Sequence, residues 1–520
     1  MIYVLDFGSQ YSHLITRRIR ELGVYAELVR HTTSLDKLKR AGGIILSGGP
    51  QNLSDSTALR IDKAVFELGI PVLGICYGMQ LTAYELGGKV KTGKKREYGP
   101  MEIEITKQNP LFKGLKNREL TWMSHGDQVV KLPRGFSGAA SSVNCRYAAM
   151  ADVKHKIYGL QFHPEVIHTK NGKKILANFL KICRAKKSRS MQDHIKNQIS
   201  KIKNEIGNQK AICALSGGVD SAVAATIVNR AIGKNLTCIY VDTGLMRKGE
   251  TEKLKKIFKN HLKMNLRIVH AEKEFLNKLR GITDPEKKRK TIGELFIRIF
   301  EREAKKMNSP HSPSLIKEGR RSSKKIKFLV QGTLYTDAIT SGVNIGKTAA
   351  VIKSHHNVGG LPAKLGFKLI EPLRDLYKDE VRKIGAILGL PKSVTQRQPF
   401  PGPGLAVRII GEVTEEKLDM LKKADAIVTQ EIVKSKFDSQ QYFAALPDIR
   451  SVGVQGDART YGHPIIVRAI TTKDFMTAHW AKLPHKLLEK ISTRITNEVR
   501  GINRVVYDIT SKPPGTVEWE

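Results

Sequence analysis

The feature that most constrains the fold of this chain is a short polar turn at residues 216–221, which separates two apolar stretches. Residues 211–215 are apolar and predict a buried strand, and the alanine-rich residues 222–228 predict a helix. The turn reads Ser-Gly-Gly-Val-Asp-Ser. A strand, a glycine turn and a helix N-terminus present free backbone N–H groups to an anion, so this stretch predicts a phosphate-binding loop in an α/β fold.

The loop has neither the Gly-Lys-Ser/Thr ending of a Walker A motif nor the Rossmann glycine spacing. The hydroxyls of Ser216 and Ser221 can donate to a phosphate. The carboxylate of Asp220 would be repelled by that phosphate unless a cation such as Mg²⁺ lies between them. We therefore expect a phosphate with a cation such as Mg²⁺ at Asp220, while the six residues alone leave an ordinary turn of small residues open.

With 520 residues the chain exceeds the size of one hydrophobic core, and we expect two to four domains. No apolar run approaches the ~20 residues of a membrane helix, and residues 1–6 read as a strand ending in an acid rather than as a secretory leader. A cytoplasmic location is therefore the expectation. The five cysteines are scattered without CxxC spacing, which predicts neither a zinc site nor a disulfide framework.

The net charge of +40 comes from 89 basic and 49 acidic residues. A polyanionic partner such as nucleic acid or a membrane is one interpretation. The basic residues are spread along the whole chain, however, and no basic segment is interleaved with aromatic residues. Anionic substrates or a lysine-biased proteome explain the same count. We therefore expect no membrane partner and no nucleic acid as the main ligand.

The first third alternates predicted strands with predicted helices, which indicates a mostly parallel sheet. The strands lie at residues 2–5, 43–46 and 71–75, and the helices at 11–22 and 77–86. Cys76 follows the third strand and opens the next helix, a position that favours a nucleophilic thiolate. Gly74 and Gly78 permit the sharp turn of a nucleophile elbow. A buried structural cysteine is the alternative.

Candidate partners for this cysteine lie downstream, in residues 158–165. A proline holds His163 in an extended conformation, so that Glu165, two residues on, can share a face with the ring and orient it. Cys76, His163 and Glu165 then form a nucleophile, its base and the orienter of that base. The backbone N–H groups of Gly49 and Tyr77 are candidates for an oxyanion hole.

These residues resemble the class I (triad) glutamine amidotransferases, whose marks here are Gly-Ile-Cys-Tyr-Gly-Met-Gln and Gln-Phe-His-Pro-Glu. The resemblance covers residues 1–184 and implies that Cys76 attacks the glutamine amide, forms a glutamyl thioester and releases ammonia. It also implies oxyanion and glutamine contacts at Gly48, Gly49, Tyr77, Gln80 and residues 124–127.

In the middle third, the lysine-rich residues 181–203 predict a linker that runs into a helix packed on the next domain. Asp242 ends a second predicted strand, where ribose or adenine contacts occur in open α/β sheets, although a helix N-cap or turn role is equally open. A basic helix is predicted at 284–300 and a disordered insertion at 305–327. Residues 353–360 have the polar, glycine-rich character of a mobile lid.

The turn that opened this section resembles the pyrophosphate loop of ATP pyrophosphatases, which split ATP into AMP and pyrophosphate by adenylating a carbonyl oxygen. On this motif alone, the NAD, argininosuccinate and asparagine synthetases and the tRNA thiolases are all open. The resemblance implies ATP contacts at Ser216, Gly217, Gly218, Val219, Asp220, Ser221, Ala222, Asp242 and Lys353, with Mg²⁺ at Asp220.

In the last third, residues 397–408 are too rich in proline and glycine for a helix and predict a rigid connector. Beyond them, strands and helices mix as in a small α+β domain. The joined pattern resembles the family of glutamine-hydrolysing GMP synthetases over nearly the whole chain, with its marks at residues 353–360, 398–408, 451–461, 472–478 and 505–520.

That resemblance implies that XMP, ATP and glutamine become GMP, AMP, pyrophosphate and glutamate. It implies dimerisation through the C-terminal domain and XMP contacts at Arg289, Asp457, Lys512 and Glu518. Both nucleotides are polyanions, which suits the lysine and the arginine of this set.

The fold class expected is α/β, with two doubly wound parallel-sheet domains and a small α+β domain. We expect an amidotransferase domain at 1–186, an ATP pyrophosphatase domain at 187–397, and a dimerisation and XMP-binding domain at 398–520. A tRNA-modifying enzyme with the same loop is the alternative function. It predicts an RNA-binding module, and the sequence shows none.

Overall fold

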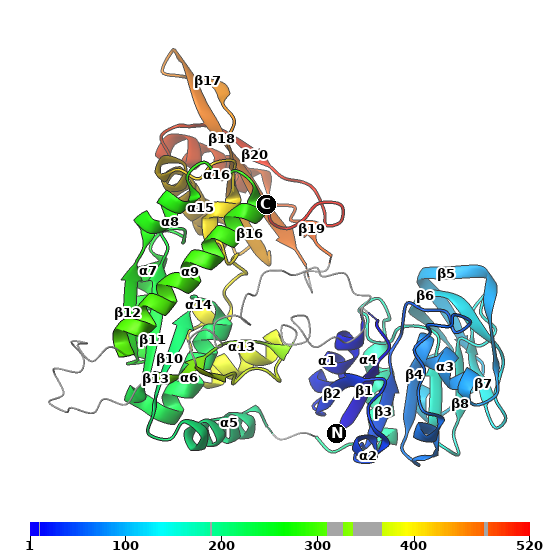
Figure 1. Ribbon diagram of the computed structural model, residues 1–520. Coiled ribbons are helices and arrows are strands. Elements are labelled where there is room, and N and C mark those ends of the chain that lie inside the picture. The colour runs from blue at the N-terminus through cyan, green and yellow to red at the C-terminus, as the bar shows by residue number, and fades with distance from the viewer. Residues whose placement is uncertain (10, 188–189, 309–325, 336–366, 473–476) are drawn as a thin grey trace. The chain divides into compact units, whose positions relative to one another are not determined.

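The computed structural model describes residues 1–9, 11–187, 190–308, 326–335, 367–472 and 477–520 (Figure 1). These residues divide into two compact units, Met1–Ser190 and the part from Met191 onward, and each is described by itself. Among the helices described, none is both long and apolar enough to cross a membrane.

The first unit is built on a nine-stranded sheet of order β2-β1-β3-β4-β9-β8-β7-β5-β6. Five of its strands are parallel: β1 (Ile2–Asp6), β2 (Ala26–Arg30), β3 (Gly43–Leu46), β4 (Val72–Ile75) and β9 (Ile157–Leu160). Four are antiparallel: β5 (Lys89–Ile105), β6 (Arg118–Lys131), β7 (Ser137–Ser141) and β8 (Ala149–Asp152). Its α-helices are α1 (Ser12–Glu21), α2 (Leu35–Leu38), α3 (Tyr77–Glu85) and α4 (Gly172–Ile182).

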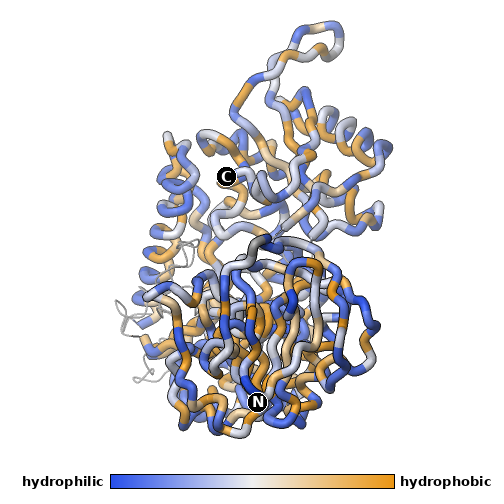
Figure 2. The backbone as a smooth tube through the Cα atoms, turned by 90° about the vertical axis from the view of Figure 1, so that its right-hand side faces the viewer, coloured by the Kyte–Doolittle hydropathy of each residue, from blue (hydrophilic) through white to orange (hydrophobic). Residues whose placement is uncertain are grey.

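The parallel strands of this unit form because their residues are apolar on both faces, as strands buried between two helical layers require. Every residue of β1, β3, β4 and β9 is buried. Figure 2 shows the hydrophobic residues running along the central strands of the unit that carries the N-terminus. The predicted strands and helices are confirmed there, whereas the long β5–β6 pair has no counterpart in the prediction.

The second unit begins with α5 (Met191–Ile206), whose isoleucines pack against the next elements as the linker prediction required. Its first sheet has the order β12-β11-β10-β13-β14 and is parallel throughout. The strands are β10 (Lys210–Leu215), β11 (Leu236–Asp242), β12 (Asn265–His270), β13 (Ile326–Val330) and β14 (Lys368–Ile370). The α-helices around it are α6 (Val219–Ile232), α7 (Glu250–Lys255), α8 (Glu272–Leu279), α9 (Pro285–Asn308), α13 (Lys378–Ile387) and α14 (Lys392–Thr395).

Strand β10 lies where this sheet reverses its strand order, with β11 on one side and β13 on the other. Ala211, Cys213 and Leu215 face a core that includes α6, while Ile212 faces a second core that includes α9. In open α/β sheets, ligands bind beyond the carboxyl ends of the strands at such a reversal. The polar turn at residues 216–221 lies at this point.

A third sheet is built around the long strand β18 (Ala458–Thr471). Its other strands are β15 (Ile409–Ile410), β16 (Gln441–Pro447), β17 (Ser451–Gln455), β19 (His479–Trp480) and β20 (Ile502–Tyr507). It is covered by α15 (Glu415–Ser435) and α16 (His485–Glu498). Residues of α15 and β18 share one hydrophobic core with Ile212 of β10, so the second and third sheets belong to one unit.

The α/β fold class is therefore confirmed, and the differences are local. Helix α9 runs to Asn308, so the expected insertion cannot begin at Lys305. Strand β13 starts at Ile326, and residues 309–325 between them lie outside the described residues. His163 follows the end of β9 in an irregular segment rather than in a strand.

Candidate active site

Cys76 lies on a strained turn between β4 and α3. Its backbone has φ 53° and ψ −108°, a conformation that residues other than glycine rarely adopt and that is typical of a nucleophile elbow. The Cys76 N–H donates to the carbonyl of Leu160 at 2.7 Å, which ties the turn to the end of β9. A Cβ on Gly74 would collide with the backbone of Gly78, so the turn can form only with glycine there. The sulfur is thereby presented at the carboxyl end of the sheet.

His163 and Glu165 form a buried pair beside this cysteine. The ring Nδ1 lies 2.7 Å from Oε1 of Glu165, and both side chains are buried. Burial lowers the pKa of His163, but the Glu165 carboxylate and the Cys76 thiol outweigh it and hold the pKa well above its usual value. Since Nδ1 faces Glu165, Nε2 is the ring atom left for the sulfur. The three residues that the motifs nominated thus lie together.

The predicted glutamine side of this site is also assembled around Cys76. Gln80 donates to the carbonyl of Asp127 at 2.8 Å and to the side chain of Gln161 at 3.3 Å. Gln161 in turn approaches the Cys76 sulfur at 3.7 Å, and that sulfur lies 3.6 Å from the carbonyl of Ser124. No role was predicted for Gln161, although it stands two residues before the catalytic histidine candidate in the same motif.

Two glycines bring backbone close to this site. A Cβ on Gly48 would lie 3.3 Å from Cε1 of His163, and one on Gly49 would lie 2.8 Å from the carbonyl oxygen of Phe7. Tyr77 is the first residue of α3, so its N–H has no acceptor within the helix. This arrangement is compatible with the predicted oxyanion hole.

A second buried histidine–carboxylate pair orders the 124–127 segment. His125 Nε2 lies 3.1 Å from Glu97, and its Nδ1 lies 3.0 Å from the carbonyl of Asp127. Ser142 donates to the other oxygen of Glu97 at 2.8 Å. Burial raises the pKa of Glu97, but these hydrogen bonds more than offset burial and the pKa lies below its usual value. Sequence reasoning missed Glu97, because a glutamate in a basic strand gives no sign of being buried.

The polar turn of the second unit folds into a compact cradle. Gly217 has φ 77°, which only glycine adopts without strain. The Ser216 and Ser221 hydroxyls lie 3.1 Å apart, and Ser221 also donates to the carbonyl of Gly218 at 3.1 Å. Helix α6 begins at Val219, so the N–H groups of its first turn face the loop. The sequence-predicted loop residues, Ser216, Gly217, Gly218, Val219, Asp220, Ser221 and Ala222, are therefore together at the start of α6.

Asp220 has one satisfied oxygen and one unsatisfied oxygen. Its Oδ2 pairs with Lys378 Nζ at 2.7 Å, a partner that the sequence did not reveal. Its Oδ1 is buried and has no hydrogen-bond partner among the described residues. A buried carboxylate oxygen without a donor fits a hard divalent cation such as Mg²⁺.

Asp242 ends β11 as predicted, but its carboxylate is engaged locally. One oxygen accepts from the N–H of Gly244 at 3.1 Å, and the other accepts from the Thr251 hydroxyl at 2.6 Å. This is the turn role that the sequence left open. Its oxygens also lie within 4.8 Å of ligand atoms of His270 and Glu272. A contact with ATP stays a prediction, and Lys353 lies outside the described residues.

The predicted XMP contacts fall into two groups. Arg289 of α9 donates to the backbone carbonyl of Glu520, while Lys512 and Glu518 belong to the C-terminal segment itself. Asp457 has φ 61° and lies exposed at the turn between β17 and β18, which projects from its sheet (Figure 1). Among the described residues, no hydrogen bond or ion pair of a side chain joins Asp457 to the other three.

Glu518 is held by residues that the sequence did not nominate. The fully buried Arg408 binds both of its carboxylate oxygens at 2.9 Å, and Gln441 donates to one of them at 2.8 Å. The fully buried Lys288 binds one carboxylate oxygen of Glu520 at 2.5 Å. In a chain of net charge +40, the sequence gives no reason to separate Arg408 and Lys288 from the many basic residues that face solvent. Their burial in the structure is what distinguishes them from those residues.

Together the fold and the two sites define a class: a cysteine-dependent amidotransferase joined to a synthase domain with a nucleotide-phosphate loop. Residues 3–183 match the family model of class-I glutamine amidotransferases, residues 189–291 that of NAD synthase, and residues 430–519 that of the GMP synthase C-terminal domain. The chain belongs to the family of glutamine-hydrolysing GMP synthases.

Full-length relatives carry this assignment. The chain is 53% identical to the GMP synthase [glutamine-hydrolyzing] of Clostridium botulinum (strain Kyoto / Type A2) and 54% identical to that of Geobacillus kaustophilus, over 100% of this chain and 99% of each relative. Among solved structures, a glutamine amidotransferase from Thermotoga maritima is 21% identical with a TM-score of 0.30, over 35% of this chain and 96% of that chain.

Proposed function

We propose that this chain makes GMP from XMP, ATP and glutamine. The observation that carries the proposal is the presence in one chain of the His163–Glu165 pair at Cys76 and of the 216–221 loop with its unsatisfied Asp220 oxygen. The first site suits amide hydrolysis, and the second suits a nucleotide phosphate. Family membership over the full length supports joining the two into one reaction.

In the first unit, the Cys76 sulfur attacks the side-chain amide carbon of glutamine. With its raised pKa, His163 holds the proton that the Cys76 thiol has given up, and it gives this proton to the leaving nitrogen, which departs as ammonia. The N–H groups of Gly49 and Tyr77 hold the carbonyl oxygen while it carries negative charge. Water then attacks the glutamyl thioester, releasing glutamate and returning the thiol.

In the second unit, the 2-oxygen of the XMP purine attacks the α-phosphorus of ATP, and pyrophosphate leaves. Ammonia then attacks the purine carbon that bears this oxygen. AMP leaves with the oxygen, which gives GMP. The hydroxyls of Ser216 and Ser221 and the first N–H groups of α6 bind the pyrophosphate portion. Asp220 would hold Mg²⁺, which when bound neutralises phosphate charge. Lys353 remains a predicted phosphate contact.

For XMP, we propose Arg289 and Lys512 as the cations for its phosphate, with Glu518 and Asp457 as further contacts. Asp457 lies on the projecting β17–β18 turn, and exposed apolar side chains flank it: Val452 is 48% exposed, Val454 74% and Tyr461 62%. An exposed apolar ribbon of this kind supports the proposal of a homodimer formed through the C-terminal domain.

The domain limits proposed are 1–186, 187–397 and 398–520, and the proposed location is the cytoplasm.

The test is a product analysis of the purified chain incubated with XMP, ATP, Mg²⁺ and glutamine. We expect GMP, AMP and glutamate to appear in equal amounts. When XMP or ATP is omitted, no GMP should form. The competing function is RNA modification by the same loop class. Absence of GMP, together with thiolation or amination of added tRNA, would favour that function instead.

A further inference from the structure

The segment 508–519 follows β20 and has almost no regular structure of its own. Among the described residues, its main chain pairs with the rest of the chain at two places: the N–H of Asp508 donates to the carbonyl of Val467 at 3.0 Å, and the N–H of Lys512 donates to the carbonyl of Ala478 at 2.7 Å within a single antiparallel bridge. Two of the proposed XMP contacts, Lys512 and Glu518, belong to this segment. Backbone carbonyls without strand or helix partners need other donors when they are buried. What holds the segment therefore also determines where these two residues lie.

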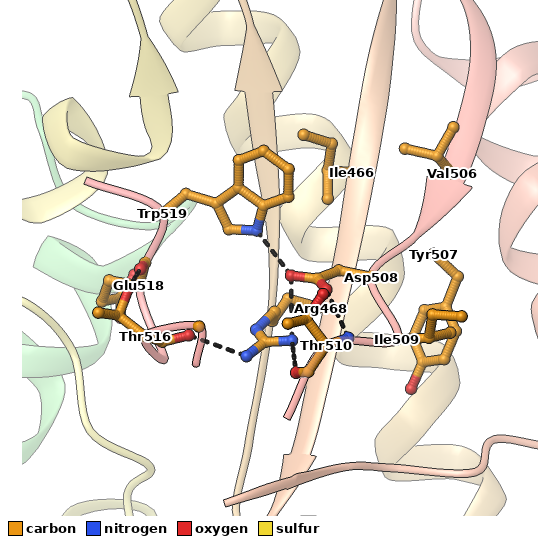
Figure 3. A pocket seen from close by; sticks show the side chains of 11 residues that line it. Ile466, Arg468, Val506, Tyr507, Asp508, Ile509, Thr510, Thr516, Glu518 and Trp519 are labelled. Atoms are coloured by element: carbon orange, nitrogen blue, oxygen red, sulfur yellow. Dashed lines mark hydrogen bonds and ion pairs between the residues drawn. The ribbon is translucent and has the colours of Figure 1, made fainter. Parts of the chain in front are cut away.

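One buried guanidinium supplies those donors. Arg468 lies in the central strand β18 and is 1% exposed. It donates to the carbonyls of Thr510 at 2.6 Å and Thr516 at 2.8 Å, and it pairs with the carboxylate of Asp508 at 3.0 Å (Figure 3). It also donates to the carbonyl of Val517 at 3.3 Å. The contacts come from both ends of the segment, so Arg468 closes it into a loop that contains Lys512.

The geometry leaves Arg468 little capacity for a ligand of its own. A guanidinium has five N–H donors, and four acceptors of the segment already bind the guanidinium of Arg468. A buried charge is tolerated only where such hydrogen bonds compensate the lost hydration. Arg468 therefore acts on bound substrate through the segment rather than by touching it.

A cavity of about 400 Å³ adjoins this arrangement. Arg468, Asp508, Glu518 and Trp519 are among the residues that line it (Figure 3). The indole N–H of Trp519 donates at 3.0 Å to the same Asp508 oxygen that pairs with Arg468. The Arg468–Asp508 pair thus fixes the end of the segment as well as its middle.

We propose that Arg468 is a positioning residue for the purine nucleotide substrate, since it holds the loop that carries Lys512 and Glu518. The proposal rests on the proposed function, and it deepens it by naming what orders the XMP side of the site. Lysine at this position would keep the charge but could not reach three carbonyls and a carboxylate from one plane.

The test compares Arg468→Lys with the wild type in steady-state kinetics of the full chain. We expect the KM for XMP to rise about tenfold or more, as the loss of charge-assisted hydrogen bonds predicts. The KM for ATP and the glutaminase rate should change less than about twofold, because neither depends on the loop. The matched control is Arg494→Lys, which alters another ion-paired arginine of the same unit, on α16, and should leave all three values unchanged.

An unchanged KM for XMP in Arg468→Lys would overturn the proposal, and so would an equal loss in every kinetic parameter, which indicates a structural role alone. Rescue of XMP binding in Arg468→Ala by millimolar guanidinium would support it. If these variants fail to fold, Asp508→Asn carries the same test, since it removes the charge that pairs with Arg468 and weakens the acceptor that Arg468 shares with Trp519. XMP binding by calorimetry keeps the outcome separate from that of the proposed function: a wild type that binds XMP but makes no GMP contradicts only the latter.

Discussion

The reactivity of Cys76 depends on two features of single residues. Its φ of 53° turns the side chain out of the helix that it begins, and the His163–Glu165 pair places a charged ring beside it. The pKa of His163 is raised because the Glu165 carboxylate and the thiol outweigh burial. Asp220 differs from Glu165, because one of its carboxylate oxygens has no donor among the described residues. This oxygen lies at the loop where a phosphate is expected.

Replacing Glu165 by glutamine should lower the pKa of His163, because the largest effect opposing burial is lost. A histidine with a raised folded pKa stabilises the fold below its unfolded pKa of about 6.5, and this contribution disappears as pH rises through the folded value. Glu165→Gln should therefore lose stability mainly at low pH. NMR titration of the His163 ring measures the shift directly. The control is Asp152→Asn, which removes the partner of the exposed His155; a His163 titration unaltered in Glu165→Gln would contradict the account.

Asp220→Asn should slow formation of AMP and pyrophosphate by at least about 100-fold, while glutamate formation continues. The physical reason is the loss of the charge that would hold Mg²⁺ between the loop and the phosphates. Both products are measured in the same incubation, so that glutamate formation controls for the activity of the first unit, and thermal unfolding of the variant controls for the folding of the second. Wild-type rates of AMP formation in this variant would show that Asp220 has no metal role.

At the scale of elements, both sites lie where a strand passes into a helix at the carboxyl ends of parallel strands. The β4–α3 turn carries the sulfur, and the β10–α6 turn carries the anion cradle. In both, close packing of backbone against backbone fixes the turn. A Cβ on Gly78 would collide with the carbonyl of Leu46, and one on Gly332 would lie 2.8 Å from the carbonyl carbon of Asp220.

A glycine that packs against backbone, such as Gly78, can be distinguished experimentally from one with open space around it, such as Gly293. Gly78→Ala should destabilise the protein by about 1–3 kcal/mol through overpacking and should reduce glutaminase activity. Gly293→Ala, in the interior of α9, should stabilise it by about 0.5–1 kcal/mol, because a Cβ there meets nothing within 4 Å. Thermal unfolding of both variants measures the effects. A stabilised Gly78→Ala, or a destabilised Gly293→Ala, would contradict this assignment.

The strands, turns and motif residues of the two sites could be predicted from the sequence, because each is marked by residues close together along the chain. Strand β10 is an apolar run, and His163 and Glu165 are two residues apart. The contacts that the sequence does not predict join distant residues: Glu97 with His125, Arg408 with Glu518, and Arg468 with the 508–519 segment. Each uses a charged residue that would ordinarily face water. Burial alone identifies them, and burial follows only from the assembled fold.

At the scale of the whole molecule, the chain divides the reaction between two compact units. The glutamine site lies in the first. The phosphate loop and the C-terminal segment lie in the second, where the second and third sheets share one hydrophobic core. That shared core keeps the proposed ATP and XMP contacts on one body, whereas ammonia is the only reactant that the first unit contributes.

The central claim is that the Cys76 site supplies ammonia to a synthase that can also use ammonia from solution. The most direct test is Cys76→Ala, assayed for GMP with XMP, ATP and Mg²⁺ and with either glutamine or an ammonium salt as the nitrogen source. The account predicts no GMP from glutamine and a rate from ammonium within about twofold of that of the wild type, because the two sites belong to separate units. GMP formed from glutamine by this variant, or none formed from ammonium, would contradict it.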